Sequence, residues 1–432
     1  MIRASLRYLG GLAAASSLSA FAIAGVADVA AAQTVTIKMW TLNTEDYPLF
    51  VEEAATEYKK THPNVEIVYE GFPNEAYKTA LQVGLVGSEP PDVFFNWAGD
   101  DAGRLVRDGL AADITEYGDK PGGYGEYLSD GWQASFAYDG KIYGVPMQAV
   151  SKYFYYNNAF FKEHNLSPPA DFGGMLQLCR DIRAIDPEIV PWPLGNSERW
   201  KLNHVITMLN QRMLGAEATA ADYALTAPDD ELFADPGYVE AWQRVLDLKE
   251  AGCFQDAPNA TAPEATRSMF SSEVSPMIYC GTWCAQIFYN EGFTDFSMFR
   301  FPSIEGGNGD PDADFFVPEG LQVSTKSAHI PEAVEWASFL VSPERAKRFA
   351  EIRGAIPSNP ALVDSVEGSP QWKWIVKDMS TFSSGVMVLD VLLNQSVSEA
   401  YLNMGVEVLN GTKTPQQAMD EIRATALAAK AK

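Results

Sequence analysis

The chain after position 34 alternates between two periods of hydrophobic residues. Residues 35–40 alternate apolar and polar positions, as a strand does, and the next positions repeat with the period of a helix. The same change of period recurs, which predicts further strands at 65–69 and 92–97 and a helix at 75–86. Strands joined by helices through short loops predict an α/β fold with a largely parallel sheet. Ligands of such sheets lie beyond the carboxyl ends of the strands, here at 41–46 and 96–101.

The later part of the chain continues the mixture of strands and helices. Asp139 and Gly140 form a turn signal within 138–143, which predicts a short hairpin. Thr414 and Gln417 have the spacing of a capping box, which predicts the start of the last helix. Further elements are expected as strands at 152–156, 275–279 and 320–325, and as helices from 281 and 342 and over 331–340. About 400 residues without a long linker suit two domains, between which the chain crosses more than once.

The first 32 residues have the pattern of a secretory signal peptide. Arg3 and Arg7 precede an apolar stretch over 9–26, and Ala30 to Ala32 supply a cleavage site before Gln33. An uncleaved membrane anchor is the alternative, but the stretch is rich in Ala, Gly and Ser and only weakly apolar. We therefore expect a protein of the periplasm without stable membrane insertion.

The charge of the chain excludes several classes of partner. The net charge is −25, with 32 basic and 57 acidic residues. Such a surface repels nucleic acids and anionic lipids, so neither is expected as a partner. The charge suits an extracytoplasmic protein but identifies no ligand.

Four cysteines allow disulfides in an oxidising compartment. If all of them pair, Cys179, Cys253, Cys280 and Cys284 permit three connectivities, and one bridge or none is the alternative. The spacing between Cys280 and Cys284 differs from that of a C-x-x-C redox motif.

No motif in the sequence indicates catalysis, a cofactor or a metal. The four histidines lack metal-ligand spacing, and neither a nucleophile elbow nor a phosphate-binding loop is present. Asp310, Asp312 and Asp314 resemble the start of a calcium loop, but Phe315 and Leu321 stand where that loop requires Gly and Glu. A solvated turn is the better interpretation, so we expect no metal, no cofactor and no catalytic residue.

Three of the ten tryptophans follow polar residues or end predicted elements, whereas Trp242 and Trp336 lie inside amphipathic helices as core residues do. Trp97 ends a strand, Trp283 begins a helix after Gly281, and Trp200 follows a cluster of hydrogen-bonding residues over 196–199. A sugar presents flat C–H faces and many hydroxyls, so its site needs aromatic platforms and planar polar groups. These tryptophans therefore point to a carbohydrate ligand.

Several segments, taken in order, resemble the extracellular solute-binding proteins of bacterial ABC importers, in the sugar-binding group that includes the maltose-binding protein. The resemblance covers nearly all of the chain after position 32, and its carriers are residues 36–40, 91–97, 139–146, 155–157, 281–283, 319–324 and 333–340. It implies two α/β lobes with a ligand cleft between them and three hinge crossings, near 145–150, 300–304 and 341–345. Lobe 1 would comprise 33–147 and 302–341, and lobe 2 would comprise 148–301 and 342–432.

By position in that family, both lobes supply ligand-binding residues. Thr282 replaces a proline of relatives beside Trp283, which retains the tryptophan but changes the loop. The C-terminal part varies within the family, so Trp372, Trp374 and Asp390 rest on weaker grounds than the others. The expected set is Asn43, Glu45, Asp46, Trp97 and Asp100 from lobe 1, Ser151, Glu198, Trp200 and Trp283 from lobe 2, Glu319 and Gly320 at a strand start, and Trp374 and Asp390.

These features predict a monomeric receptor without enzymatic activity that delivers a sugar or oligosaccharide to the permease of an ABC importer. One alternative is a receptor for another polar solute, such as a polyamine, a phosphodiester or a cation. The other is a secreted carbohydrate-active enzyme, which would need two carboxyl groups about 5–9.5 Å apart.

Overall fold

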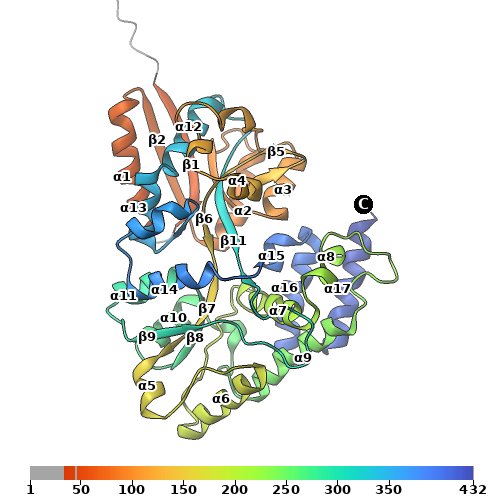
Figure 1. Ribbon diagram of the computed structural model, residues 1–432. Helices are drawn as coiled ribbons and strands as arrows, with labels where there is room; N and C mark the ends of the chain where they lie inside the picture. Colours follow the sequence, from red (N-terminus) through yellow and green to blue (C-terminus); the bar gives the residue numbers. More distant parts are fainter. Residues whose placement is uncertain (1–33, 44–45, 432) are drawn as a thin grey trace, which may run out of the picture.

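The computed structural model describes residues 34–43 and 46–431 (Figure 1). The predicted signal peptide and Glu45 lie outside these residues. The elements gather around two separate sheets, each with its own hydrophobic core. We call the part around the larger sheet the first lobe and the part around the smaller sheet the second lobe. Among the described residues, no helix is long and apolar enough to cross a membrane.

The first lobe is built on a six-stranded sheet in the order β12-β6-β11-β3-β1-β2. Strands β1, β2 and β3 are parallel, as the alternating pattern predicted, but β11 runs antiparallel to both β3 and β6. The reason is that β11 returns from the second lobe instead of following a crossover helix. The strands are β1 (Val35–Leu42), β2 (Val65–Phe72), β3 (Val93–Trp97), β6 (Val145–Val150), β11 (Val317–Val323) and β12 (Ile356–Pro357).

Helices cover this sheet and bury its apolar side chains. Trp336 is fully buried in α12, as its place on an amphipathic helix predicted. The expected hairpin forms as β4 (Ala137–Tyr138) and β5 (Lys141–Ile142), and its turn residues Asp139 and Gly140 have positive φ angles. The helices are α1 (Asp46–Thr61), α2 (Asn74–Val86), α3 (Asp100–Arg107), α4 (Asp130–Gln133), α12 (Ile330–Leu340) and α13 (Pro343–Arg353).

The second lobe has a three-stranded sheet, in the order β8-β7-β9, and a large helical layer. Its strands are β7 (Lys152–Asn157), β8 (Met277–Gly281) and β9 (Phe296–Phe299). Trp242 is fully buried among its helices, and Thr414 and Gln417 form the predicted capping box. The helices are α5 (Asn158–Glu163), α6 (Phe172–Ile185), α7 (Trp200–Leu214), α8 (Ala216–Tyr223), α9 (Pro236–Glu250), α10 (Pro263–Ser271), α11 (Trp283–Asn290), α14 (Pro370–Met379), α15 (Leu389–Leu392), α16 (Gln395–Asn410) and α17 (Pro415–Lys430).

Two segments contact a different lobe from the one to which the expected ranges assign them. Helix α13 packs on α1, and β12 pairs with β6, so residues 343–357 lie with the first sheet. Conversely, Ser303 bridges to Asp171, and Gly309 donates a backbone hydrogen bond to Arg212 O, so the chain just after Phe301 contacts the second lobe. The lobe ranges implied by the resemblance put 343–357 in lobe 2 and 302–310 in lobe 1, whereas these contacts place each segment with the other lobe.

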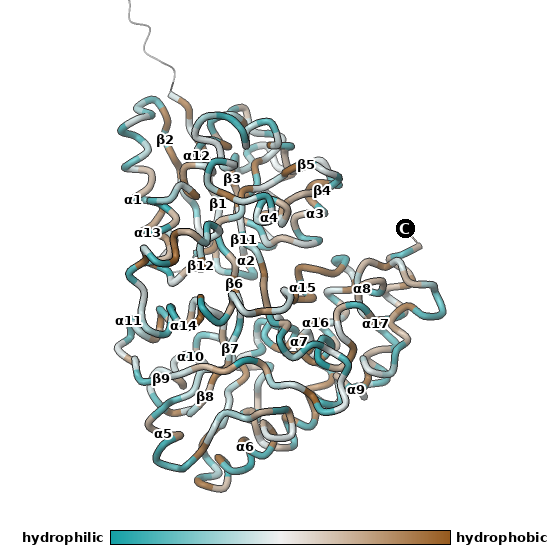
Figure 2. Tube along the Cα trace, viewed as in Figure 1, coloured by the Kyte–Doolittle hydropathy of each residue, from teal (hydrophilic) through white to brown (hydrophobic). Residues whose placement is uncertain are grey.

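A short segment between α14 and α16 touches both lobes. Its strand β13 (Gly385–Val386) pairs in parallel with β10 (Asp314–Phe315), immediately before β11 enters the first sheet. Figure 2 shows a hydrophobic stretch at α15, where Leu389 and Val391 are buried. On the other side, Val391 O approaches Gly99, where a Cβ would lie 2.7 Å from that oxygen and φ is +97°. Glycine is therefore required where this segment meets the start of α3.

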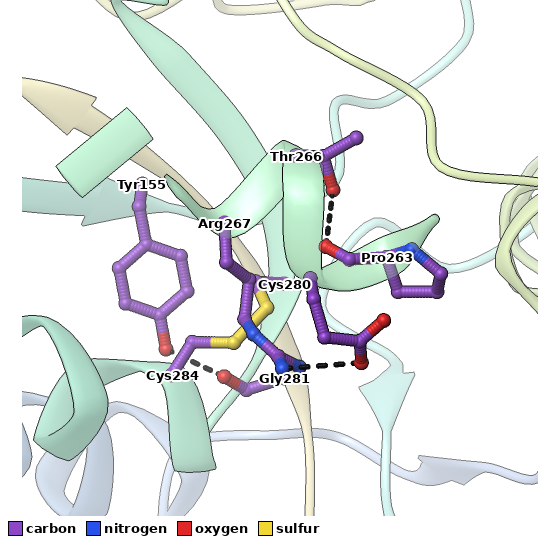
Figure 3. The surroundings of a disulfide bond; sticks show 8 residues. Tyr155, Pro263, Thr266, Arg267, Cys280, Gly281 and Cys284 are labelled. Carbon is purple, nitrogen blue, oxygen red and sulfur yellow. Dashed lines mark hydrogen bonds and ion pairs between the residues drawn. A yellow bond between two sulfur atoms is a disulfide. The ribbon is translucent and has the colours of Figure 1, made fainter. Parts of the chain in front are cut away.

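All four cysteines are paired, as Cys179–Cys253 and Cys280–Cys284. The first bridge joins α6 to the loop after α9, within the core of the second lobe. The second joins the end of β8 to the first turn of α11 (Figure 3). Between its cysteines, Gly281 O accepts a 2.9 Å hydrogen bond from the hydroxyl of Tyr155. The turn that carries Trp283 is thus tied at both ends.

Candidate functional site

A cavity of about 250 Å³ lies between helices of the two lobes. Helices α2 and α3 of the first lobe form one wall, and the residues around α7, α15 and α16 of the second lobe form the other. Most of its lining side chains are polar or charged. The lining residues are Glu75, Tyr77, Lys78, Thr79, Leu81, Gln82, Asn96, Trp97, Asp101, Arg104, Leu105, Arg199, Asp390, Gln395, Ser398, Glu399 and Leu402.

Trp97 stands in this cavity because β3 ends there. Its ring packs edge to face on Phe95, with 4.8 Å between centroids, while the side chain stays half-buried. The ammonium of Lys78 lies 5.5 Å from the centroid of the indole. The ring is therefore held by its neighbours and presents an aromatic surface beside a cation, as a platform for a polar ligand requires.

Asp390 connects the two walls of the cavity. Its carboxylate lies 3.9 Å from the ammonium of Lys78 on α2 and 3.3 Å from Nε2 of His204 on α7. Burial opposes ionisation of Asp390, but His204 and Lys78 together hold its pKa below the usual value. Burial also lowers the pKa of His204 to about 4, and the nearby charge of Lys152 adds to this. Asp390 is therefore an anion between a lysine of one lobe and a neutral histidine of the other.

Trp200 lies beside the cavity and is largely buried, with 9% of its surface exposed. Its Nε1 donates a 2.7 Å hydrogen bond to the carboxylate of Glu198. Two ammonium groups approach its ring centroid, that of Lys201 at 4.7 Å and that of Lys152 at 5.3 Å. Sequence reasoning singled out Trp200 and Glu198 but missed both lysines, because a lysine at the start of a strand or helix gives no signal of burial.

Trp283 and Trp374 lie elsewhere and do not line this cavity. The Trp283 ring folds over Gly281, where a Cβ would lie 2.0 Å from a ring carbon. It packs against the core that includes Cys280 and Cys284 and remains half-buried. Trp374 is 39% exposed, and its ring meets that of Tyr153 edge to face at 5.4 Å.

The remaining predicted residues are dispersed. Glu319 and Gly320 are buried within β11, and Glu319 accepts a 2.6 Å hydrogen bond from Gln148. Asp100 pairs with Arg107 on the outer side of α3, whereas its neighbour Asp101 lines the cavity. Ser151 is fully buried, Asn43 is exposed at the end of β1, and Asp46 begins α1.

The structure thus brings Trp97 and Asp390 together in one cavity, with Glu198 and Trp200 next to its lining residue Arg199. The charged lining residues of α2, α3 and α16 were not predicted. Their positions on solvent-facing turns of amphipathic helices look like ordinary surface positions in the sequence, and only the second lobe makes them part of a cavity.

The described residues contain no group of three or more His, Cys, Asp or Glu side chains that could hold a metal ion. At the calcium-like segment, Asp310 accepts a 2.8 Å hydrogen bond from the backbone of Asp312, which forms a turn. Asp314 is buried and lies 3.8 Å from the guanidinium of Arg212 instead of facing its neighbours in sequence. This geometry agrees with the solvated turn predicted for Asp310 and Asp312, but places Asp314 inside the core.

Comparison with known proteins places the chain among binding proteins. An ABC transporter extracellular-binding protein of Pyrococcus horikoshii is 26% identical over 294 residues, which span 67% of this chain and 64% of that relative. The multiple sugar-binding protein of Streptococcus mutans is 22% identical over 307 residues, 69% of each chain. The structure of a chitin oligosaccharide binding protein superposes with a TM-score of 0.83, at 19% identity, over 92% of this chain and all of that one.

The fold is therefore that of the periplasmic binding proteins. The family of bacterial extracellular solute-binding proteins matches residues 53–377, which is most of the chain. Members of this family bind solutes and are not enzymes. The chain belongs to the bacterial extracellular solute-binding protein family.

Proposed function

We propose that this protein is the periplasmic receptor of an ABC importer and that it carries a sugar or oligosaccharide to the permease. The observation that carries the proposal is the cavity between the lobes, where the Trp97 platform meets charged and amide side chains from both sides. The names of two relatives, a multiple sugar-binding protein and a chitin oligosaccharide binding protein, support a carbohydrate ligand.

We further propose that the lobes close over the ligand about a hinge of three crossings. The candidates are residues 150–152 between β6 and β7, residues 315–317 between β10 and β11, and the chain after β12. The first lobe would then comprise 34–150 and 317–357, and the second lobe the rest. A ligand that contacts both walls of the cavity stabilises the closed form by its differential affinity for the two states. Asp390 supports this scheme because it pairs with Lys78 across the cavity.

Three of the other predicted residues, Trp283, Trp374 and Ser151, enter this proposal as a second part of the cleft. Trp283 and Trp374 are aromatic side chains with exposed surface, and Ser151 follows directly on β6 at the first crossing. An oligosaccharide longer than the cavity between α2 and α15 would extend from Trp97 toward Trp283. A monosaccharide would need only the Trp97 end.

The test is a thermal-shift screen of the purified protein against mono- and oligosaccharides, followed by calorimetric titration of each ligand found. Ligand at 100 times its Kd adds about 2.7 kcal/mol of stability. For lobes of about 150–250 residues this raises the Tm by about 5–11 °C. The sugar should be recovered unchanged after incubation. Stabilisation by polyamines or phosphodiesters, with none by any carbohydrate, would contradict the proposal.

A pair of variants then locates the ligand. Trp97→Ala removes the platform and should weaken affinity by about 2 kcal/mol, or about thirtyfold. Tyr289→Ala removes an aromatic ring that is 44% exposed at the end of α11, outside the cavity, and should leave affinity unchanged. Equal affinities of the two variants would place the ligand elsewhere.

A further inference from the structure

Two lysines of the second lobe are buried side by side behind the cavity. Lys152 is the first residue of β7 and Lys201 lies in the first turn of α7, and they are 3% and 4% exposed. Both ammonium groups lie against the indole of Trp200, and that of Lys152 is also 4.8 Å from the ring of Tyr279. Lysine is almost never fully buried unless it is paired, so two such residues around one tryptophan need an explanation.

In the part of the chain that the structure describes, no ion pair joins either lysine to a carboxylate. Among the described residues, Nζ of Lys152 has no hydrogen-bond partner. The contacts with aromatic rings are favourable for a cation, but each contributes only about 0.5–2 kcal/mol. That is less than the several kcal/mol that an unpaired charge loses on leaving water. Burial accordingly lowers the pKa of both amines, and it lowers that of Lys201 to about 7. For Lys152, the nearby charge of Lys201 lowers the pKa further.

The charged groups on the neighbouring elements do not supply the missing negative charge. Asp390 on α15 acts on Lys152, but its oxygens lie nearest to His204 and Lys78. Glu264 and Glu198 favour the charged form of Lys201, but Arg267 on α10 opposes it more strongly than either does, and Arg267 itself pairs with Glu264 at 3.2 Å. His204 stays neutral because burial lowers its pKa to about 4. Asp390 is thus shared among Lys78, His204 and Lys152. The two carboxylates that act on Lys201 are themselves bound to Trp200 and Arg267.

The cavity in front of this cluster is lined by cations and carboxylates from both lobes. Lys78, Arg104 and Arg199 line it, and Nε of Arg104 is buried without a hydrogen-bond partner among the described residues. Of the carboxylates in the lining, Glu75 pairs with Lys78 at 3.4 Å, and Glu399 pairs with Arg199 at 2.9 Å.

Asp101, also in the lining, is a weak counter-charge. Burial raises the pKa of its carboxyl to about 7, against the attraction of Lys78, so Asp101 is a weaker anion than an exposed carboxylate. Asp101 belongs to the first-lobe wall, whereas Asp390 and Glu399 line the second-lobe wall together with Arg199. Lys78 and Arg199 of the lining are therefore paired with carboxylates, whereas the two lysines behind Trp200 are paired with none among the residues that the structure describes.

We propose that the ligand is an acidic sugar, a uronic acid or an oligosaccharide that contains one, and that its carboxylate binds Lys152 and Lys201 beside Trp200. The inference rests on the proposed function and names the substrate class of that site. Charge-assisted hydrogen bonds from two ammonium groups to one carboxylate would supply the partner that Nζ of Lys152 lacks among the described residues, and an anion beside Lys201. A turn of the Trp200 side chain, whose Nε1 is bound only by Glu198, is the movement that would bring the two amines to the ligand.

The test compares matched sugars by calorimetry at pH 8: galacturonic acid with galactose, and di- and trigalacturonate with neutral galacto-oligosaccharides of the same length. The acidic member of at least one pair should bind ten times more tightly or better. Its binding should also take up protons, because an anion raises the pKa of amines that are partly neutral in the free protein. Proton uptake is measured by repeating the titration in two buffers of different ionisation enthalpy.

Three variants assign the effect to the lysine. Lys152→Met keeps the length of the side chain and should abolish both the preference for the acid and most of the proton uptake. Lys152→Arg keeps a cation there and should retain the preference. Lys162→Met, at an exposed position on α5 beyond the far end of β7 from Lys152, is the control and should behave as the wild type. Melting temperatures of all three variants establish that each is folded before titration.

The outcomes separate this inference from the proposed function. Tight binding of neutral sugars with no gain from a carboxylate would overturn the inference and leave the proposed function intact. The same holds if Lys152→Met retains the full preference for the acid. Failure of all sugars, neutral and acidic, would overturn the proposed function and the inference together.

Discussion

The two disulfides close loops of very different length, and this difference predicts how much each stabilises the fold. Cys179 and Cys253 are 74 positions apart, whereas Cys280 and Cys284 are separated by only 4. A disulfide stabilises mainly by limiting the freedom of the unfolded chain, and the effect grows with the logarithm of the loop length. All four cysteines are fully buried, so replacing either pair by alanine removes the same number of buried sulfur atoms.

The chain-entropy relation gives the magnitude. For the loop closed by Cys179–Cys253 it predicts a stabilisation of about 4.5 kcal/mol, and for that closed by Cys280–Cys284 about 1.9 kcal/mol. The cost of the small cavities left by alanine is similar in the two double variants and cancels in their comparison. The Cys179→Ala/Cys253→Ala protein should therefore be less stable than the Cys280→Ala/Cys284→Ala protein by about 2.6 kcal/mol.

The measurement is urea unfolding of both double variants and the wild type, followed by far-ultraviolet circular dichroism and by tryptophan fluorescence. Because both bridges lie in the second lobe, the fluorescence of Trp192 and Trp242 in its core reports the relevant transition. A Tm difference of about 5–10 °C between the double variants should accompany the free-energy difference. Equal stabilities, or a larger loss from removing Cys280–Cys284, would refute the reasoning from loop length.

Three further predictions follow from the site. If Trp283 is a platform, Trp283→Ala should weaken sugar affinity by about 2 kcal/mol at little cost in stability. A loss of about 3–5 kcal/mol in the free energy of unfolding, with unchanged affinity, would show that Trp283 is a core residue only. The pKa of His204 is about 4 when folded and 6.5 in its unperturbed state, so its contribution to stability is lost as the pH falls from 6.5 toward 4. Between pH 8 and 4.5 this loss is about 2–3 kcal/mol. The free energy of unfolding from urea titrations should therefore fall by about that much more for the wild type than for His204→Gln. Hinge closure should lower the radius of gyration in small-angle scattering on addition of the sugar that binds, and identical curves at saturation would argue against closure.

The local pattern of the sequence was sufficient for those features that depend on neighbours within one element. The strands β1 to β3, the hairpin at Asp139 and Gly140 and the capping box at Thr414 all follow from positions a few residues apart, and each is present in the structure. The burial of Trp242 and Trp336 followed likewise from their place on an amphipathic helix. Element boundaries shifted by two or three residues, for example from 275–279 to β8 at Met277–Gly281.

The tertiary structure decided what depends on residues far apart in the chain. Asp390 and Lys78 are more than 300 positions apart, and only the return of the segment after α14 to the first lobe brings their side chains to 3.9 Å. Three other features depend in the same way on contacts between segments far apart in the chain. They are the pairing of the four cysteines, the antiparallel return of β11 and the burial of Lys152 and Lys201. The hydrophobic period of a segment shows which face of that helix or strand is buried. It does not show which charged side chains another helix or strand brings next to that face. The sequence by itself therefore determined the elements and the α/β class of this protein, whereas the set of side chains around the cavity was decided by how the two lobes meet.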